Sequence, residues 1–178
     1  RAAGVTGFLA MPTDDRDNAG LLAAIDARDP APGDPAIRFA AWVDPSDIAT
    51  PAFLETHAAR IAALKVHPSF SRRPVSDPGF APFLVAAAAH DWPVIVHCGR
   101  WREVAGYEIA LDTAAAHPDV RFVLSHMGGD SPALVFGCAQ AIRDRGLRNA
   151  WLGTESIREP WLVRRVIDLA GADRVVFG

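Results

Sequence analysis

The chain is poor in residues that form disulfides, bind nucleic acid or span a membrane. It has only two cysteines, Cys98 and Cys138, which are too few for a disulfide framework and favour a reducing, cytoplasmic setting. The net charge is -3 and no run of lysine and arginine occurs, which argues against a nucleic-acid partner. The apolar stretches, of which 82–89 is an example, are far shorter than the roughly 20 residues of a membrane span.

A glycine-rich phosphate loop is also missing. No Gly-x-Gly-x-x-Gly motif follows an apolar run, so a dinucleotide-binding fold has no support. The chain has instead a regular alternation of short apolar runs and longer helix-like stretches. The runs predict strands that recur about every 25–32 residues, the length of one strand–helix unit, at 5–11, 37–43, 63–67, 93–98, 121–126, 149–154 and 174–177. The stretches between them predict helices at 18–28, 51–62, 79–90, 104–117, 131–145 and 159–170.

Strands and helices that alternate in this way form a parallel sheet whose outer face is covered by helices. Seven units without a break in rhythm favour an α/β fold, the TIM-like (β/α)8 barrel, over an open doubly wound sheet. Such a barrel takes about 250 residues. We therefore expect residues 1–178 to form a single, partial barrel domain that contains strands two to eight. Residues 1–4 have the pattern of a helix end with a glycine stop, and the chain finishes in a strand.

Three of the predicted strands end on a histidine: His67, His97 and His126. The C-terminal ends of parallel barrel strands meet on one face, so we expect these imidazoles to lie in one site. Imidazole suits zinc, iron, copper and nickel, and a catalytic metal keeps one position open for water. The other histidines fall on helices or helix ends, where we expect them to be solvated or capping: His57, His90 and His117.

Side chains alternate between the two faces of a strand, which predicts the set that faces into the barrel. The pairs expected to face inward together are Lys65 with His67, Ile95 with His97, and Leu124 with His126. A lysine and three imidazoles inside a barrel are costly unless they are paired, hydrated or bound to metal.

Four motifs occur in an order that resembles the amidohydrolase superfamily, and most closely the branch that includes aminocarboxymuconate-semialdehyde decarboxylase. They are KVHP (65–68), PVIVHCG (93–99), FVLSHMGG (122–129) and ADRVVFG (172–178), so the resemblance covers essentially the whole chain. It implies a TIM-like barrel in which His97 matches the metal-binding histidine of the fifth strand. His126 matches the sixth-strand histidine, which in the family is a second ligand or an acid/base group. Lys65 stands where some members carry a carboxylated lysine that bridges two metals.

The same resemblance implies a divalent metal cofactor, zinc, with manganese or iron as alternatives. The family's first-strand His-x-His pair has no counterpart in this sequence, and its eighth-strand aspartate would come directly after Gly178. Two histidines are fewer than the three or more protein ligands of a catalytic metal. We therefore expect this chain to carry only part of the metal centre.

Cationic and polar residues follow the predicted strands on the same face. Those expected to contact substrate are His67, Arg72, Arg100 and Glu155, with Arg73, Arg102, Trp101 and Ser156 in the same loops. Because arginine binds carboxylates through paired hydrogen bonds, the loops favour a small substrate that bears a carboxylate.

The leading hypothesis is a metal-dependent hydrolase that acts on such a substrate through metal-activated water, with His126 as the catalytic acid/base. A decarboxylase or hydratase on the same metal site is one alternative. Another is an aldolase-like lyase that forms a Schiff base on Lys65. The last is a catalytically incomplete barrel fragment that serves as a binding or scaffold module.

Overall fold

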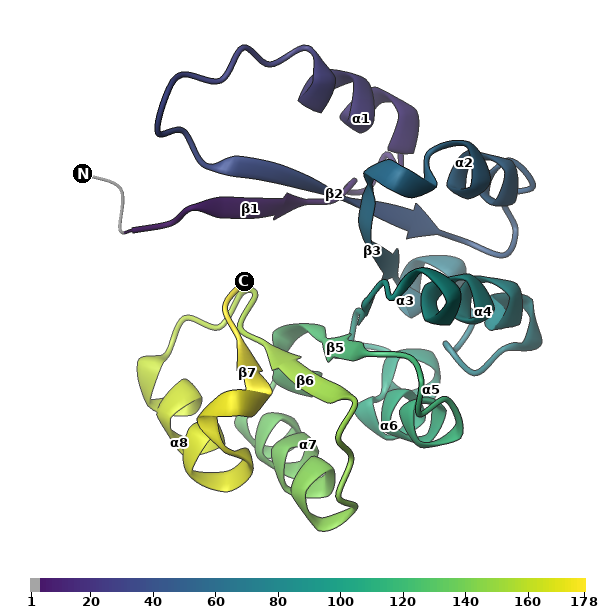
Figure 1. Ribbon diagram of the computed structural model, residues 1–178. Coiled ribbons are helices and arrows are strands. Elements are labelled where there is room, and N and C mark those ends of the chain that lie inside the picture. Colours follow the sequence, from purple (N-terminus) through teal and green to yellow (C-terminus); the bar gives the residue numbers. More distant parts are fainter. Residues whose placement is uncertain (1–3) are drawn as a thin grey trace.

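Seven parallel strands form one sheet, in the order in which they occur along the chain. The structure is a computed structural model that describes residues 4–178, so most of the helix end expected at residues 1–4 lies outside it. The strands are β1 (Gly7–Ala10), β2 (Ala36–Val43), β3 (Ile61–Val66), β4 (Val94–Val96), β5 (Phe122–Leu124), β6 (Ala150–Gly153) and β7 (Val175–Val176). Figure 1 shows the sheet curling into a half-barrel with the helices on its outer side. The expected partial α/β barrel is therefore confirmed.

Helices connect the strands, and they differ from the sequence prediction in several places. The short helix at Pro68–Ser71 was not predicted, and the helix predicted at 79–90 begins as a 3₁₀ turn at Pro78–Phe80. The helix predicted at 51–62 ends at Thr56, because Ile61 is buried in the sheet and already belongs to β3. The helix predicted at 104–117 is divided at Gly106, whose backbone is extended (φ -66°, ψ 140°). The helices are α1 (Asn18–Asp26), α2 (Thr50–Thr56), α3 (Pro68–Ser71), α4 (Ala81–His90), α5 (Arg102–Ala105), α6 (Tyr107–Ala116), α7 (Pro132–Asp144) and α8 (Pro160–Ala170), and the 3₁₀ turns are η1 (Ala58–Arg60), η2 (Pro78–Phe80), η3 (Ser125–Gly128) and η4 (Ala172–Arg174).

Within residues 4–178, no helix combines the length and the hydrophobicity that a membrane crossing requires.

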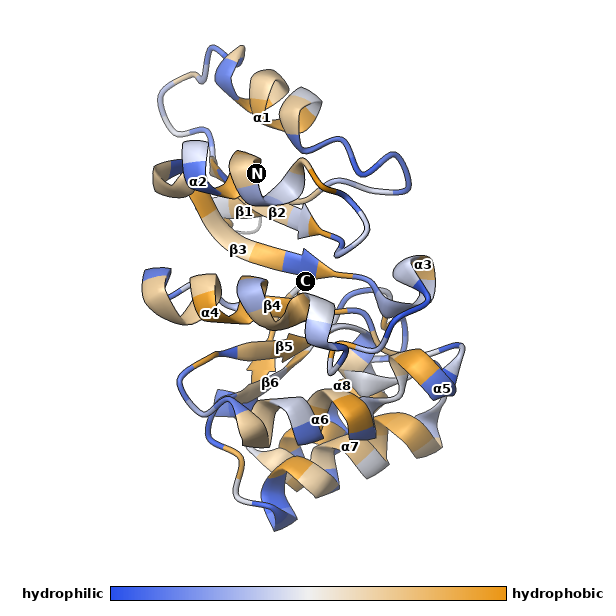
Figure 2. Ribbon diagram, turned by 90° about the vertical axis from the view of Figure 1, so that its right-hand side faces the viewer, coloured by the Kyte–Doolittle hydropathy of each residue, from blue (hydrophilic) through white to orange (hydrophobic). Residues whose placement is uncertain are grey.

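Two apolar layers hold the sheet. The larger one lies between the sheet and the helices, and its fully buried members include Phe39, Leu64, Leu111, Phe122 and Leu124. The smaller one lies on the inner face, where Ala40, Ala63 and Ile95 pack together with Met11 and Val123. Figure 2 shows that the strand segments are mostly hydrophobic, as expected of a sheet with apolar layers on both faces.

The inward face of β5 differs from the prediction. Val123 packs in the inner layer, level with Ile95 of β4, whereas Leu124 is fully buried in the outer layer. The predicted inward pairing of Leu124 with His126 is therefore wrong, and Val123 is followed on the inner face by Ser125. His126 reaches the site by a different route, because the chain leaves the strand at η3 in a left-handed turn. Its φ is 59°, and the next two residues have φ values of 52° and 90°.

The third residue of this turn, Gly128, is a position where only glycine fits. A Cβ there would lie 2.4 Å from Cys138 Sγ of α7, whereas the same atom at Gly146, also at positive φ, would meet nothing within 4 Å. We expect Gly146→Ala to lower the free energy of unfolding by about 1–2 kcal/mol, the cost of a left-handed residue with a Cβ. Gly128→Ala should cost about 1–3 kcal/mol more, because it also overpacks the layer beneath the turn. Urea unfolding checks this, and equal losses in the two variants would contradict the packing.

Candidate functional site

The three histidines predicted at strand ends lie together. His67 follows β3, His97 follows β4 and His126 lies in η3 after β5. The rings of His67 and His97 stack, with centroids 3.7 Å apart and planes 15° apart. The ring of His126 stands nearly perpendicular to that of His97, at 77° and 4.8 Å between centroids. Across this corner, His126 Nε2 lies 3.1 Å from His97 Nδ1.

A backbone carbonyl sets the tautomer of His126. Its Nδ1 lies 2.8 Å from the carbonyl oxygen of Glu155, which follows β6. A carbonyl oxygen only accepts, so Nδ1 carries the proton and donates it. In the neutral ring Nε2 then has a free lone pair, and that atom faces His97. The position of His126 is thus fixed from the next strand of the sheet.

The other two imidazoles are kept neutral by their surroundings. Burial lowers the pKa of His67 to about 4, and the charge of Lys65 acts in the same direction. Burial lowers the pKa of His97 to about 3, and His67 and His126 add to the effect. Both rings are therefore neutral at neutral pH, which is the form that binds metal. Because His126 Nε2 accepts in this pair, His97 Nδ1 donates to it in the metal-free protein, and its proton would have to move to Nε2 for Nδ1 to bind metal.

The facing nitrogens of His97 and His126 fit two ligand positions of one metal ion. Two nitrogens at about 2.0–2.1 Å from a tetrahedral zinc ion lie roughly 3.4 Å apart, close to the 3.1 Å found here. His67 cannot share that ion with His97, because in-plane lone pairs of two parallel rings do not converge. Among residues 4–178 there is no group of three histidine, cysteine or acidic side chains that could hold a metal. Within the described residues, no third histidine, cysteine or acidic side chain joins the two facing nitrogens in such a group.

Lys65 lies within β3, two residues before His67. It is 6% exposed, and its Nζ donates to Ser125 Oγ at 3.2 Å. Burial lowers its pKa to about 8, although the Glu155 carboxylate opposes this shift. Lys65 is not among the side chains that line the cavity above the histidines.

Glu155 also lies outside the cavity lining. Its carboxylate folds back over Gly153 and Gly178, and Oε2 is buried without a hydrogen-bond partner in the described chain. The part of Glu155 that reaches the site is its backbone carbonyl.

A cavity of about 860 Å³ opens above the histidines. Most of the loop residues singled out in the sequence line it, namely His67, Arg72, Arg100, Trp101 and Ser156. The Arg72 guanidinium lies 4.9 Å from the centre of the Trp101 ring. Two of the four loop arginines are not part of the lining, because they pair elsewhere: Arg73 with Asp77 at 3.3 Å and Arg102 with Glu108 at 2.6 Å.

Several cavity residues were missed by the strand-end reasoning. Phe70, Arg158 and Trp161 line the cavity from α3, from the loop after β6 and from α8. They lie three or more residues beyond a strand end, so the rule that found the histidines does not reach them. The remaining histidines lie at helix ends as predicted: His57, His90 and His117.

The depressed pKa values predict the acid behaviour of the protein. We expect His67 and His97 to stay uncharged in the folded state down to about pH 5, well below the usual histidine pKa of about 6.5. The unfolded chain protonates both rings near that usual value, so the free energy of unfolding should fall as the pH drops from about 6.5 towards 4. Imidazole ¹⁵N shifts and urea unfolding at several pH values measure both effects. Midpoints near 6.5 in the folded protein would contradict the burial of these rings.

Solved structures with the same fold are enzymes of related kinds. A 2,6-dihydroxybenzoate decarboxylase from Rhizobium superposes with a TM-score of 0.64 at 17% identity, covering 92% of this chain and 64% of that one. A probable 2-pyrone-4,6-dicarboxylic acid hydrolase from Acinetobacter baumannii gives 0.63 at 13% identity, with 97% and 67% covered. A 5-carboxyvanillate decarboxylase from Novosphingobium aromaticivorans, solved with bound manganese, gives 0.61 at 15% identity, with 92% and 59% covered.

The chain thus spans about three fifths of the length of the solved structures that it resembles. Among curated protein sequences, none matches it significantly. A sequence model of the amidohydrolase family matches residues 5–178, which is nearly the whole chain. The chain therefore belongs to the amidohydrolase family.

Proposed function

We propose that the protein is a metal-dependent hydrolase that acts on a small, carboxylate-bearing substrate. The observation that carries this proposal is the pair of facing nitrogens, His97 Nδ1 and His126 Nε2, at the base of a cavity bordered by arginines. Zinc is the metal we expect, with manganese or iron as alternatives, and the further ligands would come from outside residues 4–178. A divalent metal held there lowers the pKa of water towards about 7 and polarises a carbonyl oxygen.

The chain's own groups would orient the reactants and move protons. The hydrogen bond from His126 Nδ1 to the Glu155 carbonyl keeps Nε2 free, so this atom can bind metal. In the alternative role that the family assigns to this histidine, Nε2 takes a proton while Nδ1 stays bonded to the carbonyl. His97 offers Nδ1 from the neighbouring strand.

The cavity walls suit a flat substrate with negative charge. Arg72, Arg100 and Arg158 lie on its border and would bind carboxylates. The aromatic rings of Phe70, Trp101 and Trp161 lie among the lining residues and would pack against an apolar body. His67 would contact the substrate from the cavity floor.

Loss of carbon dioxide, or hydration, on the same metal site is the second candidate. The aromatic, arginine-bordered cavity favours it, because partial removal of water destabilises a carboxylate that is about to leave. Two of the three solved structures described above are decarboxylases. A Schiff base on Lys65 has less support, because its Nζ is buried, bonded to Ser125 and outside the cavity lining.

Metal analysis tests the site itself. In protein that also carries the further ligands, we expect about one zinc or manganese ion per chain to remain bound after gel filtration, and His97→Ala and His126→Ala to lose it, because each removes one of two described ligands. Activity should fall by about 10²–10⁴-fold in both variants. His117→Ala, at the end of α6, is the matched control and should keep its metal. A wild-type protein that binds no divalent metal would overturn the proposal in favour of an incomplete barrel.

The arginines give a test of substrate class. With aromatic carboxylic acids and their esters or lactones as trial substrates, Arg72→Met and Arg100→Met should raise KM by about 10-fold or more, the value of a charged hydrogen bond. Arg73→Met is the control, because Arg73 pairs with Asp77 outside the cavity. Measuring carbon dioxide release beside acid release separates decarboxylation from hydrolysis. An unchanged KM in both cavity variants would remove the carboxylate from the proposal.

A further inference from the structure

Three flat side chains form a stack across the ends of β2, β3 and β4. Trp42 is 5% exposed, and its ring lies 5.4 Å from that of His67 with planes 16° apart. His67 in turn stacks on His97 at 3.7 Å and 15°. These residues come from consecutive strands, so the stack runs along the rim of the half-barrel and ends at the candidate metal ligand.

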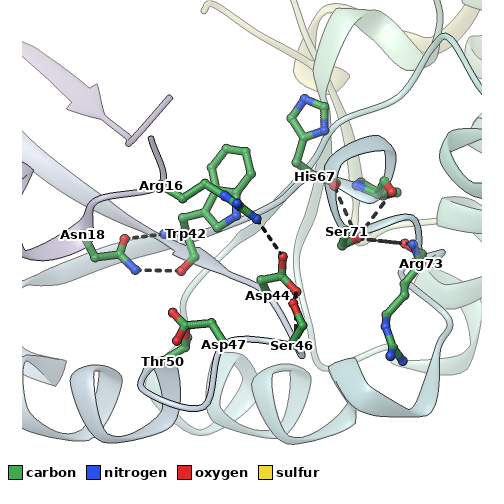
Figure 3. Close-up of polar contacts among 11 residues, drawn as sticks. Arg16, Asn18, Trp42, Asp44, Ser46, Asp47, Thr50, His67, Ser71 and Arg73 are labelled. Carbon is green, nitrogen blue, oxygen red and sulfur yellow. Dashed lines mark hydrogen bonds and ion pairs between the residues drawn. The ribbon is translucent and has the colours of Figure 1, made fainter. Parts of the chain in front are cut away.

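The backbone of Trp42 is held by an asparagine side chain at a point where β1 no longer pairs with β2. Pairing between β1 and β2 ends at Ala10 and Phe39, three residues before Trp42. There the Asn18 side chain donates to the Trp42 carbonyl oxygen at 2.8 Å and accepts from the Trp42 amide at 2.7 Å (Figure 3). On its other side Trp42 lies in register with Lys65 of β3, while both of its own backbone groups are bonded to Asn18. Asn18 is the first residue of α1, so this helix fixes where the Trp42 ring lies.

The middle ring, that of His67, is held by contacts with other rings and not by hydrogen bonds to its nitrogens. Its Nδ1 is buried and has no hydrogen-bond partner within the described chain. Trp42 covers one face and His97 the other, while the ring of Phe70 meets it edge-on at 4.4 Å and 63°. A polar ring in such a position contributes mainly a flat surface.

The last ring, His97, has few other restraints on its orientation. Its one side-chain hydrogen bond in the described chain is to His126 Nε2. The torsion that turns an imidazole about its bond to Cβ is broad, so a single contact leaves the tilt of the ring plane loosely held. Stacking on His67 holds the plane of the ring, and within that plane the contact with His126 selects the orientation in which Nδ1 faces it.

We propose that Trp42 and His67 are positioning residues for His97, and that Asn18 fixes the stack through the backbone of Trp42. This inference rests on the proposed function in one respect only, namely that His97 binds metal. It assigns His67 a role that depends on its flat ring, in addition to the contact with substrate suggested by its place on the cavity floor. Removing a positioning partner of a metal ligand typically weakens metal binding by about 10–100-fold.

The decisive comparison is between His67→Phe, which keeps a flat ring but no nitrogen, and His67→Ala, which keeps neither. In metal-free protein labelled on histidine, we expect the ring-current shift of the His97 ring protons to persist in the first and to vanish in the second. Zinc affinity, measured by competition with a chromogenic chelator, should stay within about 3-fold of wild type for His67→Phe and fall by about 10-fold or more for His67→Ala. Trp42→Leu and Asn18→Ala should weaken zinc binding in the same direction.

Controls separate positioning from loss of stability and from failure of the metal hypothesis. Asn149→Ala removes three part-buried hydrogen bonds to carbonyl groups far from the stack, so it should lower stability without changing the His97 signals or zinc affinity. If His67→Ala fails to fold, His67→Leu keeps the bulk and removes the flat ring. Equal losses of zinc affinity in His67→Phe and His67→Ala would overturn the proposal, because the nitrogen would then be what matters. If the wild type binds no metal, the proposed function fails, and the ring-current comparison alone still decides whether the stack holds His97.

Discussion

The candidate site depends on the left-handed turn that follows β5. Strand alternation would send Ser125 into the barrel and His126 away from it, and the lysine bond to Ser125 confirms the first part. Three consecutive residues at positive φ, from His126 to Gly128, bring the imidazole back over the strand ends. The turn is held from below, because Met127 is fully buried and Gly128 lies against Cys138 of α7. Packing in the outer layer thus offsets the strain of the turn that brings His126 to the candidate site.

Around that turn the site is assembled from neighbouring strands, each contributing one group in register. The imidazoles of His67 and His97 and the backbone carbonyl of Glu155 all meet at the C-terminal edge of the sheet, as parallel topology dictates. The loops beyond these groups carry the arginines and aromatic rings. Barrel enzymes change reactions by changing such loops, so hydrolases and decarboxylases with one fold are expected. The proposed metal chemistry therefore rests on the ends of the strands, and the proposed acidic, flat substrate rests on the loops.

Sequence periodicity predicted the seven strands, their parallel order and the gathering of three histidines, because each rests on local patterns. It failed where long-range packing decides the outcome. Leu124 was predicted to face inward together with His126. No local pattern in the sequence predicts that a non-glycine residue such as His126 adopts positive φ, which is how His126 reaches the inner face. Arg73 was grouped with the cavity arginines, although Asp77 lies four residues on as a ready partner. The two hydrogen bonds between Asn18 and Trp42 join residues 24 positions apart, so no local sequence pattern predicts them.

The central claim is that His97 and His126 share one metal ion through the two nitrogens that face each other. The most direct test is a crystal structure of the protein grown with zinc or manganese, with the metal located by its anomalous scattering. The account predicts an ion about 2.0–2.2 Å from both His97 Nδ1 and His126 Nε2, with His126 Nδ1 still bonded to the Glu155 carbonyl. An ion bound away from this pair, or one held by His97 Nε2, would contradict it.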